Sequence, residues 1–164
     1  YVDRLYIAKG RNSEKAIAVL LGDMDQLPKI AREAKDYAHK IAASFWPGPL
    51  TLIVPRQPSL PASLSSTPDV GVRIPDHPLA LALLRLAGPL AVTSANISGM
   101  ESTTTAQEVM AQLNGRIHLV IDGGPSPGGI PSTVVDCTGR EPVILREGPI
   151  TMADIESVLK QAEK

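Results

Sequence analysis

The chain of 164 residues is 43% hydrophobic, which suits one domain with a single sizeable core. Its 16 lysines and arginines nearly cancel its 17 acidic residues, so no global field favours nucleic acid or a membrane surface, and any anion site must be local. Cys137 is the only cysteine, which excludes an intramolecular disulfide and a CxxC metal site. We expect its thiol to be a small buried group in a strand.

Neither a membrane span nor a secretory leader is predicted. The most apolar stretch, residues 78–90, is interrupted by Arg85 and Gly88 and is too short to cross a bilayer. Residues 1–11 lack the apolar region and cleavage site of a signal peptide, which predicts a cytoplasmic protein. Residue 1 is tyrosine rather than methionine, so we expect the chain to be an N-terminally shortened piece.

The first half of the chain alternates helices with strands. A long helix is expected to begin at Asp23 or Asp25 and to end before Pro47. Residues 55–69, rich in Pro and Ser, are expected to form a surface loop. The other expected elements are a helix over residues 1–7 and strands over residues 16–21, 50–54 and 70–74.

The second half continues this alternation and ends with a helix. Thr105 and Glu108 have the spacing of a capping box for a helix to Leu113, and residues 123–131 predict a loop. Thr151 is expected to cap a final helix with Ile155, Val158, Leu159 and Ala162 on its apolar face. The remaining expected elements are a helix over residues 77–86 and strands over residues 90–93, 117–121, 133–137 and 143–146.

These elements predict an α/β fold with one domain over residues 1–164. Because helices and strands are interleaved but consecutive strands also occur, the sheet should be twisted, open and mixed, with helices packed on it.

The sequence argues against several common kinds of site. The histidines, His39, His77 and His118, lie far apart, so no zinc site is expected. The chain has no GxGxxG, no GxxxxGK[ST] and no GxSxG, which argues against dinucleotide binding, a Walker-type phosphate site and triad hydrolysis.

Cations and small polar residues instead follow predicted apolar elements. They are Lys9, Arg11, Lys15, Arg73, Ser94, Asn96 and Arg146. Arg73 interrupts a buried strand, where a guanidinium needs an anionic partner, and a nucleotide triphosphate would supply one. Singly, each residue has an ordinary structural interpretation: Arg73 could pair with Asp69 or Asp76, and Ser94 and Asn96 could satisfy a turn.

Six segments, in this order, resemble the YrdC-like family. They are IAKGR at 7–11, WPGPLTLIVP at 46–55, VGVRIPDHP at 70–78, TSANISG at 93–99, PSTVVD at 131–136 and ILREG at 144–148. The resemblance implies a single twisted α/β domain with a concave, positively charged cavity. It also implies a nucleotidyltransferase reaction, in which L-threonine, bicarbonate and ATP with Mg²⁺ give threonylcarbamoyl-AMP and pyrophosphate. The product would pass to a downstream threonylcarbamoyl-transferase complex that modifies tRNA.

The resemblance also assigns roles to residues. Lys9 and Arg11 would be the catalytic pair at the phosphates, and Arg73 would bind the threonine carboxylate. Thr51 would be a wall of the pocket. The full ATP set would be Lys9, Arg11, Lys15, Ser94, Asn96, Thr103 and Arg146, and the threonine set Arg73, Thr93 and Ser132. No tightly bound metal is implied.

Two departures from the family pattern affect the threonine site. The Pro-Thr-x-Thr-x-Tyr-Gly-Leu segment usual upstream of the KxR pair is absent, so part of the threonine pocket and an edge of the sheet would be missing. Leu20 stands where some members have histidine. We therefore expect this chain to bind ATP better than threonine and to make the adenylate poorly.

Three alternatives remain open. The concave basic surface could bind double-stranded RNA or tRNA without turnover. The chain could be the carbamoyl-transfer domain of a larger enzyme, although acylphosphatase-like and zinc-finger sequences are absent. It could also be an inactive fragment, as Tyr1 suggests.

Overall fold

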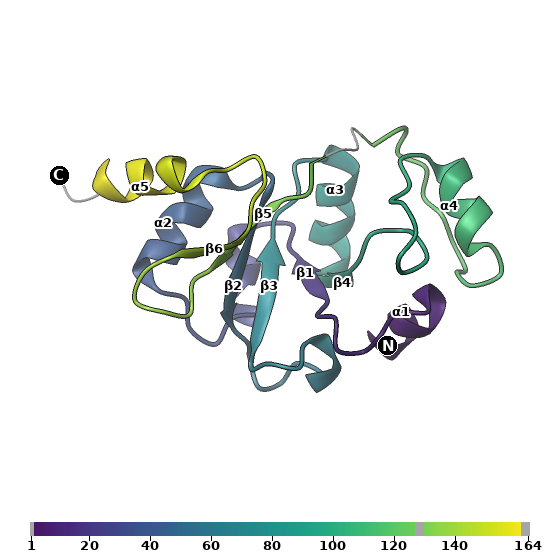
Figure 1. Cartoon of the computed structure of the whole chain (residues 1–164), viewed down its shortest axis with the longest axis horizontal. Helices are drawn as coiled ribbons and strands as arrows, with labels where there is room; N and C mark the ends of the chain where they lie inside the picture. Colours follow the sequence, from purple (N-terminus) through teal and green to yellow (C-terminus); the bar gives the residue numbers. More distant parts are fainter. Residues whose placement is uncertain (1, 127–129, 162–164) are drawn as a thin grey trace.

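Six strands form one mixed sheet in residues 2–126 and 130–161, the part of the chain that the computed structural model describes (Figure 1). In chain order the elements are α1 (Val2–Lys9), β1 (Ala18–Leu20), the 3-10 helix η1 (Met24–Lys29), α2 (Asp36–Phe45), β2 (Leu50–Pro55), the 3-10 helix η2 (Ala62–Leu64), β3 (Asp69–Arg73), α3 (Pro78–Ala87), β4 (Leu90–Val92), α4 (Ala106–Leu113), β5 (Thr133–Asp136), β6 (Val143–Arg146) and α5 (Met152–Gln161).

The sheet has the strand order β4-β1-β3-β2-β5-β6. β1 is parallel to β3 and β2 is parallel to β5, whereas β1 with β4, β2 with β3 and β5 with β6 are antiparallel. Within the described residues β4 and β6 each have one neighbour in this order, so the sheet is open. The expected α/β fold with an open mixed sheet and flanking helices is confirmed.

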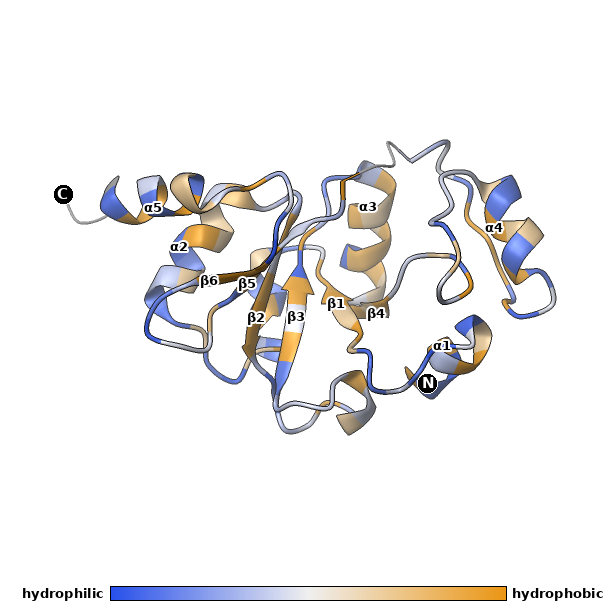
Figure 2. Ribbon diagram, in the orientation of Figure 1, coloured by the Kyte–Doolittle hydropathy of each residue, from blue (hydrophilic) through white to orange (hydrophobic). Residues whose placement is uncertain are grey.

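Core-facing and cavity-facing residues alternate along the central strands, because successive residues of a strand point to opposite faces. On one face Val19, Leu52 and Val72 are buried in the core. On the other face lie Ala18 and Gly71, which line a cavity. In Figure 2 hydrophobic residues dominate β1, β2 and β3, while α4 and α5 alternate between hydrophobic and hydrophilic residues.

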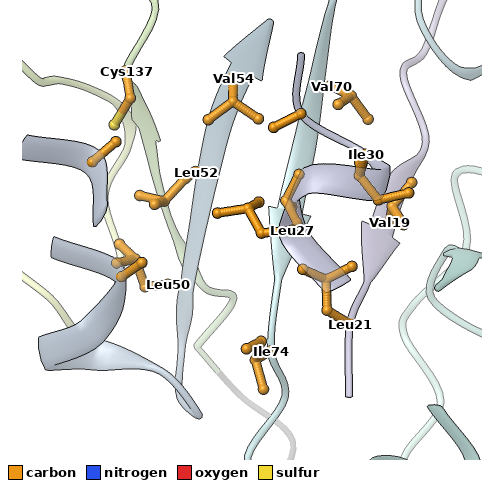
Figure 3. Close-up of a cluster of buried hydrophobic side chains, with 14 of the residues drawn as sticks. Val19, Leu21, Leu27, Ile30, Leu50, Leu52, Val54, Val70, Ile74 and Cys137 are labelled. Carbon is orange, nitrogen blue, oxygen red and sulfur yellow. The ribbon is translucent and has the colours of Figure 1, made fainter. Parts of the chain in front are cut away.

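Three helices cover the core face of the sheet. Leu27 of η1, Ile41 of α2 and Ile155 of α5 all belong to the buried apolar cluster. Figure 1 shows α2 and α5 side by side at one end of the sheet, and Figure 3 shows Leu27 among the buried side chains of the central strands. Full burial of one such side chain contributes about 1.5–3 kcal/mol, so this face holds the fold together and leaves the other face for a site.

The single long helix expected from Asp23 to Pro47 was wrong, because η1 and α2 are separate elements. The backbone between them pairs with the end of β2. Ala31 forms an antiparallel bridge with Arg56, and the Arg32 N–H donates to the Pro55 carbonyl at 2.9 Å. These bonds take the backbone out of the helical ladder. Asp23 precedes η1 without capping it, since its carboxylate binds Arg85 at 2.9 Å.

The strand expected over residues 117–121 was also wrong, since none of these residues is in a strand. Among residues 2–126 and 130–161, no strand pairs with this apolar run. Leu119 and Ile121 are consequently exposed, at 76% and 55%. In the described residues β4, at the nearest sheet edge, pairs only with β1.

Local predictions near the helix ends were confirmed. Thr105 and Glu108 form a reciprocal capping box at the start of α4. The Thr151 hydroxyl oxygen accepts the Asp154 N–H at 3.2 Å at the start of α5, where Ile155 is buried. Ala162, expected on the apolar face of that helix, lies outside the described residues, as do residues 127–129 of the expected Gly- and Pro-rich loop.

Cys137 directly follows β5 and is buried, close to its expected place. Burial, with a smaller contribution from the charge of Asp136, raises the pKa of its thiol to about 12. Over residues 2–126 and 130–161, the helices are all too short or too polar to cross a membrane.

Candidate functional site

A cavity of about 590 Å³ lies on the face of the sheet opposite the core. Its floor is apolar and consists of small or branched side chains from the central strands, namely Ala18, Leu20, Ile53, Gly71 and Val134. Its polar wall consists of Arg11, Thr51, Arg73, Thr93, Ser94, Ser102, Ser132 and Arg146. Among the described residues that line it, three are arginines and none is acidic.

Backbone carbonyl groups hold the three guanidinium groups in place. Arg73 Nε donates to the Gly48 carbonyl at 2.9 Å, and Arg11 Nη2 donates to the Ala16 carbonyl at 2.9 Å. Arg146 donates to the Ser132 carbonyl from Nε at 3.1 Å and from Nη2 at 2.8 Å. A guanidinium has five N–H donors, so these bonds fix each group and leave donors for a ligand. They bring no negative charge into the cavity.

One end of the cavity, here called the Arg73 end, combines Arg73, Arg146, Thr51 and Ser132. Strand register brings them together: Leu52 is opposite Val72, so Thr51 lies beside Arg73. Thr51 Oγ1 and Ser132 Oγ are 2.9 Å apart, and Arg146 Nη2 lies 3.1 Å from the same Ser132 oxygen. Two cations and two hydroxyl groups thus converge on one place.

A close backbone approach fixes Arg146 beside Ser132. A Cβ atom on Gly148 would lie 2.4 Å from the Thr133 nitrogen and 2.6 Å from the Pro131 oxygen. Only glycine lets the segment after β6 pack this tightly against the start of β5. The glycine of the ILREG motif therefore positions its arginine.

The opposite end, here called the Arg11 end, combines Arg11, Thr93, Ser94 and Ser102. It lies at the start of β1, since Ala18 pairs with Val92 and Arg11 binds the Ala16 carbonyl. The Arg73 end lies at the other end of β1, where Leu20 pairs with Arg73. Residues 16 and 20 mark the two ends, and the extended chain between them places their Cα atoms at most about 13 Å apart. The cavity therefore has two polar ends with an apolar floor between them.

Burial and a neighbouring positive charge both change the pKa of Arg73. Burial lowers its pKa, and the positive charge of Arg146 lowers it further. Both effects act against the charged form, so an anion entering the cavity would relieve them. This electrostatic arrangement suits an anionic ligand that also has an apolar part for the floor.

Seven of the residues predicted from the sequence line this one cavity: Arg11, Thr51, Arg73, Thr93, Ser94, Ser132 and Arg146. The other four are not among its lining residues. Lys9 and Asn96 are buried and bonded to each other, with Lys9 Nζ 3.2 Å from Asn96 Oδ1. Thr103 donates to the Ala95 carbonyl at 2.9 Å, and the Lys15 side chain is exposed. Their assignment to ATP stays a prediction.

Sequence reasoning missed Gly71 and Ser102. Gly71 precedes Arg73 by two residues in β3, so the period of two along a strand could have placed both on the cavity face. Ser102 lies in the polar run STTT, which gave no signal. Within residues 2–126 and 130–161, no group of three or more His, Cys, Asp and Glu side chains could hold a metal ion.

Comparisons with known proteins agree with this fold and motif order. The family model for the Sua5, YciO and YrdC proteins, described as telomere recombination, matches residues 1–148. The threonylcarbamoyl-AMP synthase of Bacillus subtilis is 44% identical over 161 residues, covering 96% of this chain and 46% of that protein.

Solved structures give the same result. Pyrococcus abyssi Sua5 in complex with L-threonine is 39% identical, with a TM-score of 0.90 over 96% of this chain and 47% of that one. Escherichia coli YciO is 26% identical, with a TM-score of 0.82 over 93% of this chain and 75% of that one. The chain spans less than half the length of the Bacillus and Pyrococcus proteins. On the family match and these likenesses, the chain belongs to the Sua5, YciO and YrdC family.

Proposed function

We propose that this chain forms threonylcarbamoyl-AMP and pyrophosphate from L-threonine, bicarbonate and ATP, with ATP entering as its Mg²⁺ complex. One observation carries the proposal: among the described residues that line the cavity, three are arginines and none is acidic. The names of the relatives support it, since the Bacillus protein is a threonylcarbamoyl-AMP synthase and the Pyrococcus structure contains L-threonine.

The proposed chemistry needs cations more than it needs a base. The threonine amine and bicarbonate first give N-carboxy-threonine and water. An oxygen of the new N-carboxylate, the carbamate group, then attacks the α-phosphorus of ATP and forms a new P–O bond. The bond from the α-phosphorus to the bridging oxygen breaks, and its electron pair leaves on pyrophosphate. Because the nucleophile is already anionic, the step at phosphorus requires positioning and charge neutralisation, which arginines supply. Among the described residues, the cavity lining has no Asp or Glu side chain to repel the anionic nucleophile, which fits this requirement.

The two polar ends suggest where each substrate lies. At the Arg73 end, a guanidinium beside the hydroxyl groups of Thr51 and Ser132 suits the carboxylate of threonine. At the Arg11 end, Arg11 and Ser94 suit the phosphates. Arg146 lies at the Arg73 end, so we place the phosphate that it would bind next to the amino acid, where the reacting groups must meet.

We further propose that the reaction takes place in the cytoplasm and that the product serves a threonylcarbamoyl-transferase complex acting on tRNA. A free buried cysteine is consistent with a reducing compartment. Threonylcarbamoyl-AMP is a mixed anhydride, so a transferase with a nucleophilic acceptor must consume it.

Calorimetric titration of two arginine variants tests the placement of substrates. Arg11→Met should weaken binding of MgATP, and Arg73→Met should weaken binding of threonine with bicarbonate. Each loss should be roughly ten- to a hundred-fold, the effect of one charge-assisted hydrogen bond of about 1.5–3 kcal/mol. Arg140→Met, at an exposed arginine outside the cavity lining, is the matched control. If both cavity variants bound both ligands as the control does, the proposal would be wrong.

A further inference from the structure

Lys9 is buried at the end of α1 and is only 4% exposed, although the cavity that its neighbour Arg11 lines is open to ligand. We propose that Lys9 is a positioning residue, which holds the loop of residues 94–96 against α1 and so sets Ser94 opposite Arg11 without touching the nucleotide. The inference rests on the proposed function, because it specifies how the Arg11 end of that site is built.

The hydrogen bonds of the Lys9 ammonium group carry this inference. An ammonium group has three N–H donors. Lys9 Nζ donates to the Ser94 carbonyl, to the Asn96 carbonyl and to Asn96 Oδ1, the last at 3.2 Å. Three donors thus meet three oxygens of one loop. In this arrangement none is left for a phosphate.

The backbone of Lys9 is bonded to the segment that directly follows this loop, and the loop is bonded to the same segment. The Ser98 N–H donates to the Lys9 carbonyl at 2.9 Å, and Asn96 Nδ2 donates to the Met100 carbonyl at 2.7 Å. Gly10 then turns the chain with a φ of 58°, and Arg11 follows on the cavity wall. The end of α1 and the loop therefore form one unit that fixes the spacing between Arg11 and Ser94.

The charge of Lys9 is compensated by oxygen dipoles. The described part of the chain has ion pairs at Arg85 and at Lys160, and neither involves Lys9. Burial lowers the pKa of Lys9, and the charge of Arg11 lowers it further. Lys9→Met removes the ammonium group and would leave the two carbonyls and the Asn96 amide oxygen without their donor, so the loop should loosen.

A double-mutant cycle on MgATP affinity separates the two roles of Lys9. If Lys9 acts through the loop, Lys9→Met should lower affinity about tenfold, and adding Ser94→Ala should lower it by no more than about twofold further, because coupled residues are not additive. If Lys9 binds phosphate independently, the two losses should multiply. Lys29→Met, at an exposed lysine outside the cavity lining, is the control and should bind as the original chain does.

Hydrogen exchange without nucleotide tests the same inference independently of the proposed function. Lys9→Met should speed exchange at the Ser98 amide and its neighbours, whereas a lysine that serves only as a phosphate ligand would leave the exchange rates unchanged. If the original chain bound no MgATP, the proposed function would fail while this comparison still decided the role of Lys9.

Lys9→Arg keeps the inference testable if Lys9→Met does not fold. A planar guanidinium cannot reproduce three bonds from one ammonium nitrogen. A positioning role therefore predicts that this variant loses MgATP affinity about tenfold and exchanges faster at Ser98. Retained affinity together with unchanged exchange would identify Lys9 as a phosphate ligand and overturn the proposal.

Discussion

Arg73 and Arg146 place two like charges at one end of an otherwise uncompensated cavity. The pKa of Arg73 is lowered first by its burial and then by the charge of Arg146. Hydrogen bonds to the Gly48 and Ser132 carbonyls hold the two side chains there. Two like charges kept together oppose folding and favour binding of an anion. Removing the Arg146 charge should therefore weaken anion binding without lowering the stability of the ligand-free chain.

Pyrophosphate should raise the melting temperature of the chain, because a ligand that binds only the folded state stabilises it. At a pyrophosphate concentration of about 100 times Kd the gain is about 2.7 kcal/mol. Arg146→Met should remove most of this gain while leaving the melting temperature of the ligand-free chain unchanged or slightly raised. Differential scanning fluorimetry of Arg146→Met and Arg140→Met measures both effects. An equal pyrophosphate shift in the two variants would contradict an anion site at Arg146.

Gly71 should control the depth of the cavity floor. A Cβ atom at this position would lie 3.3 Å from Thr51 Cγ2 and 3.4 Å from Ile53 Cδ1, so any side chain must project into the cavity. Gly71→Val should weaken ligand binding by at least about tenfold while the strand remains intact, since β-branched residues suit strands. Calorimetry combined with urea unfolding checks this. Normal binding by a folded Gly71→Val chain would show that the ligand does not use the floor.

Glu108 should make stability sensitive to acid. Hydrogen bonds to its carboxylate, chiefly from the Thr104 backbone N–H, lower its pKa below the ordinary value of 4.5. Between the lowered and the ordinary pKa the unfolded chain binds more protons than the folded chain, so the free energy of unfolding rises with pH there. Its stabilising contribution is complete above 4.5 and is lost as pH falls through the lowered value. Urea unfolding over this range should show a smaller acid loss for Glu108→Gln; identical pH profiles would argue against the capping contribution.

Cys137 should resist alkylation in the folded chain. Burial raises the pKa of its thiol to about 12, and the thiolate is the reactive form. At about pH 8 iodoacetamide should therefore modify this thiol slowly, and modification should become rapid in denaturant. Intact-mass spectrometry follows the reaction. Rapid modification of the native chain would show that this part of the core opens readily.

Much of the fold was predictable because its signals are local. Short apolar runs rich in β-branched residues predicted β2 and β3, and the spacing of Thr105 and Glu108 predicted the start of α4. The two errors depend on distant partners. Ala31 leaves the helix because Arg56 pairs with it, and residues 117–121 remain outside the sheet because no strand in the described residues pairs with them. The pattern of apolar residues indicates what a segment can form, but it does not specify which distant segment pairs with its backbone.

The site was predictable as a set of residues but not as an arrangement. Motif order indicated seven residues that line the cavity, yet the sequence did not separate those that face the ligand from those that support them. Lys9 and Arg11 are two residues apart, and only the turn at Gly10 directs one into the loop of residues 94–96 and the other onto the cavity wall. The same limit applies to Leu20, whose place beside Arg73 follows from strand register.

Pyrophosphate release by this chain in MgATP, L-threonine and bicarbonate tests the proposed activity most directly. Release should require all three substrates, and Arg11→Met and Arg73→Met should each reduce the rate at least about tenfold, since the reaction needs both substrates held in line. Arg140→Met should match the original chain. Release that is independent of threonine, or its complete absence while double-stranded RNA binds in low salt, would contradict threonylcarbamoyl-AMP synthesis as the function of this chain.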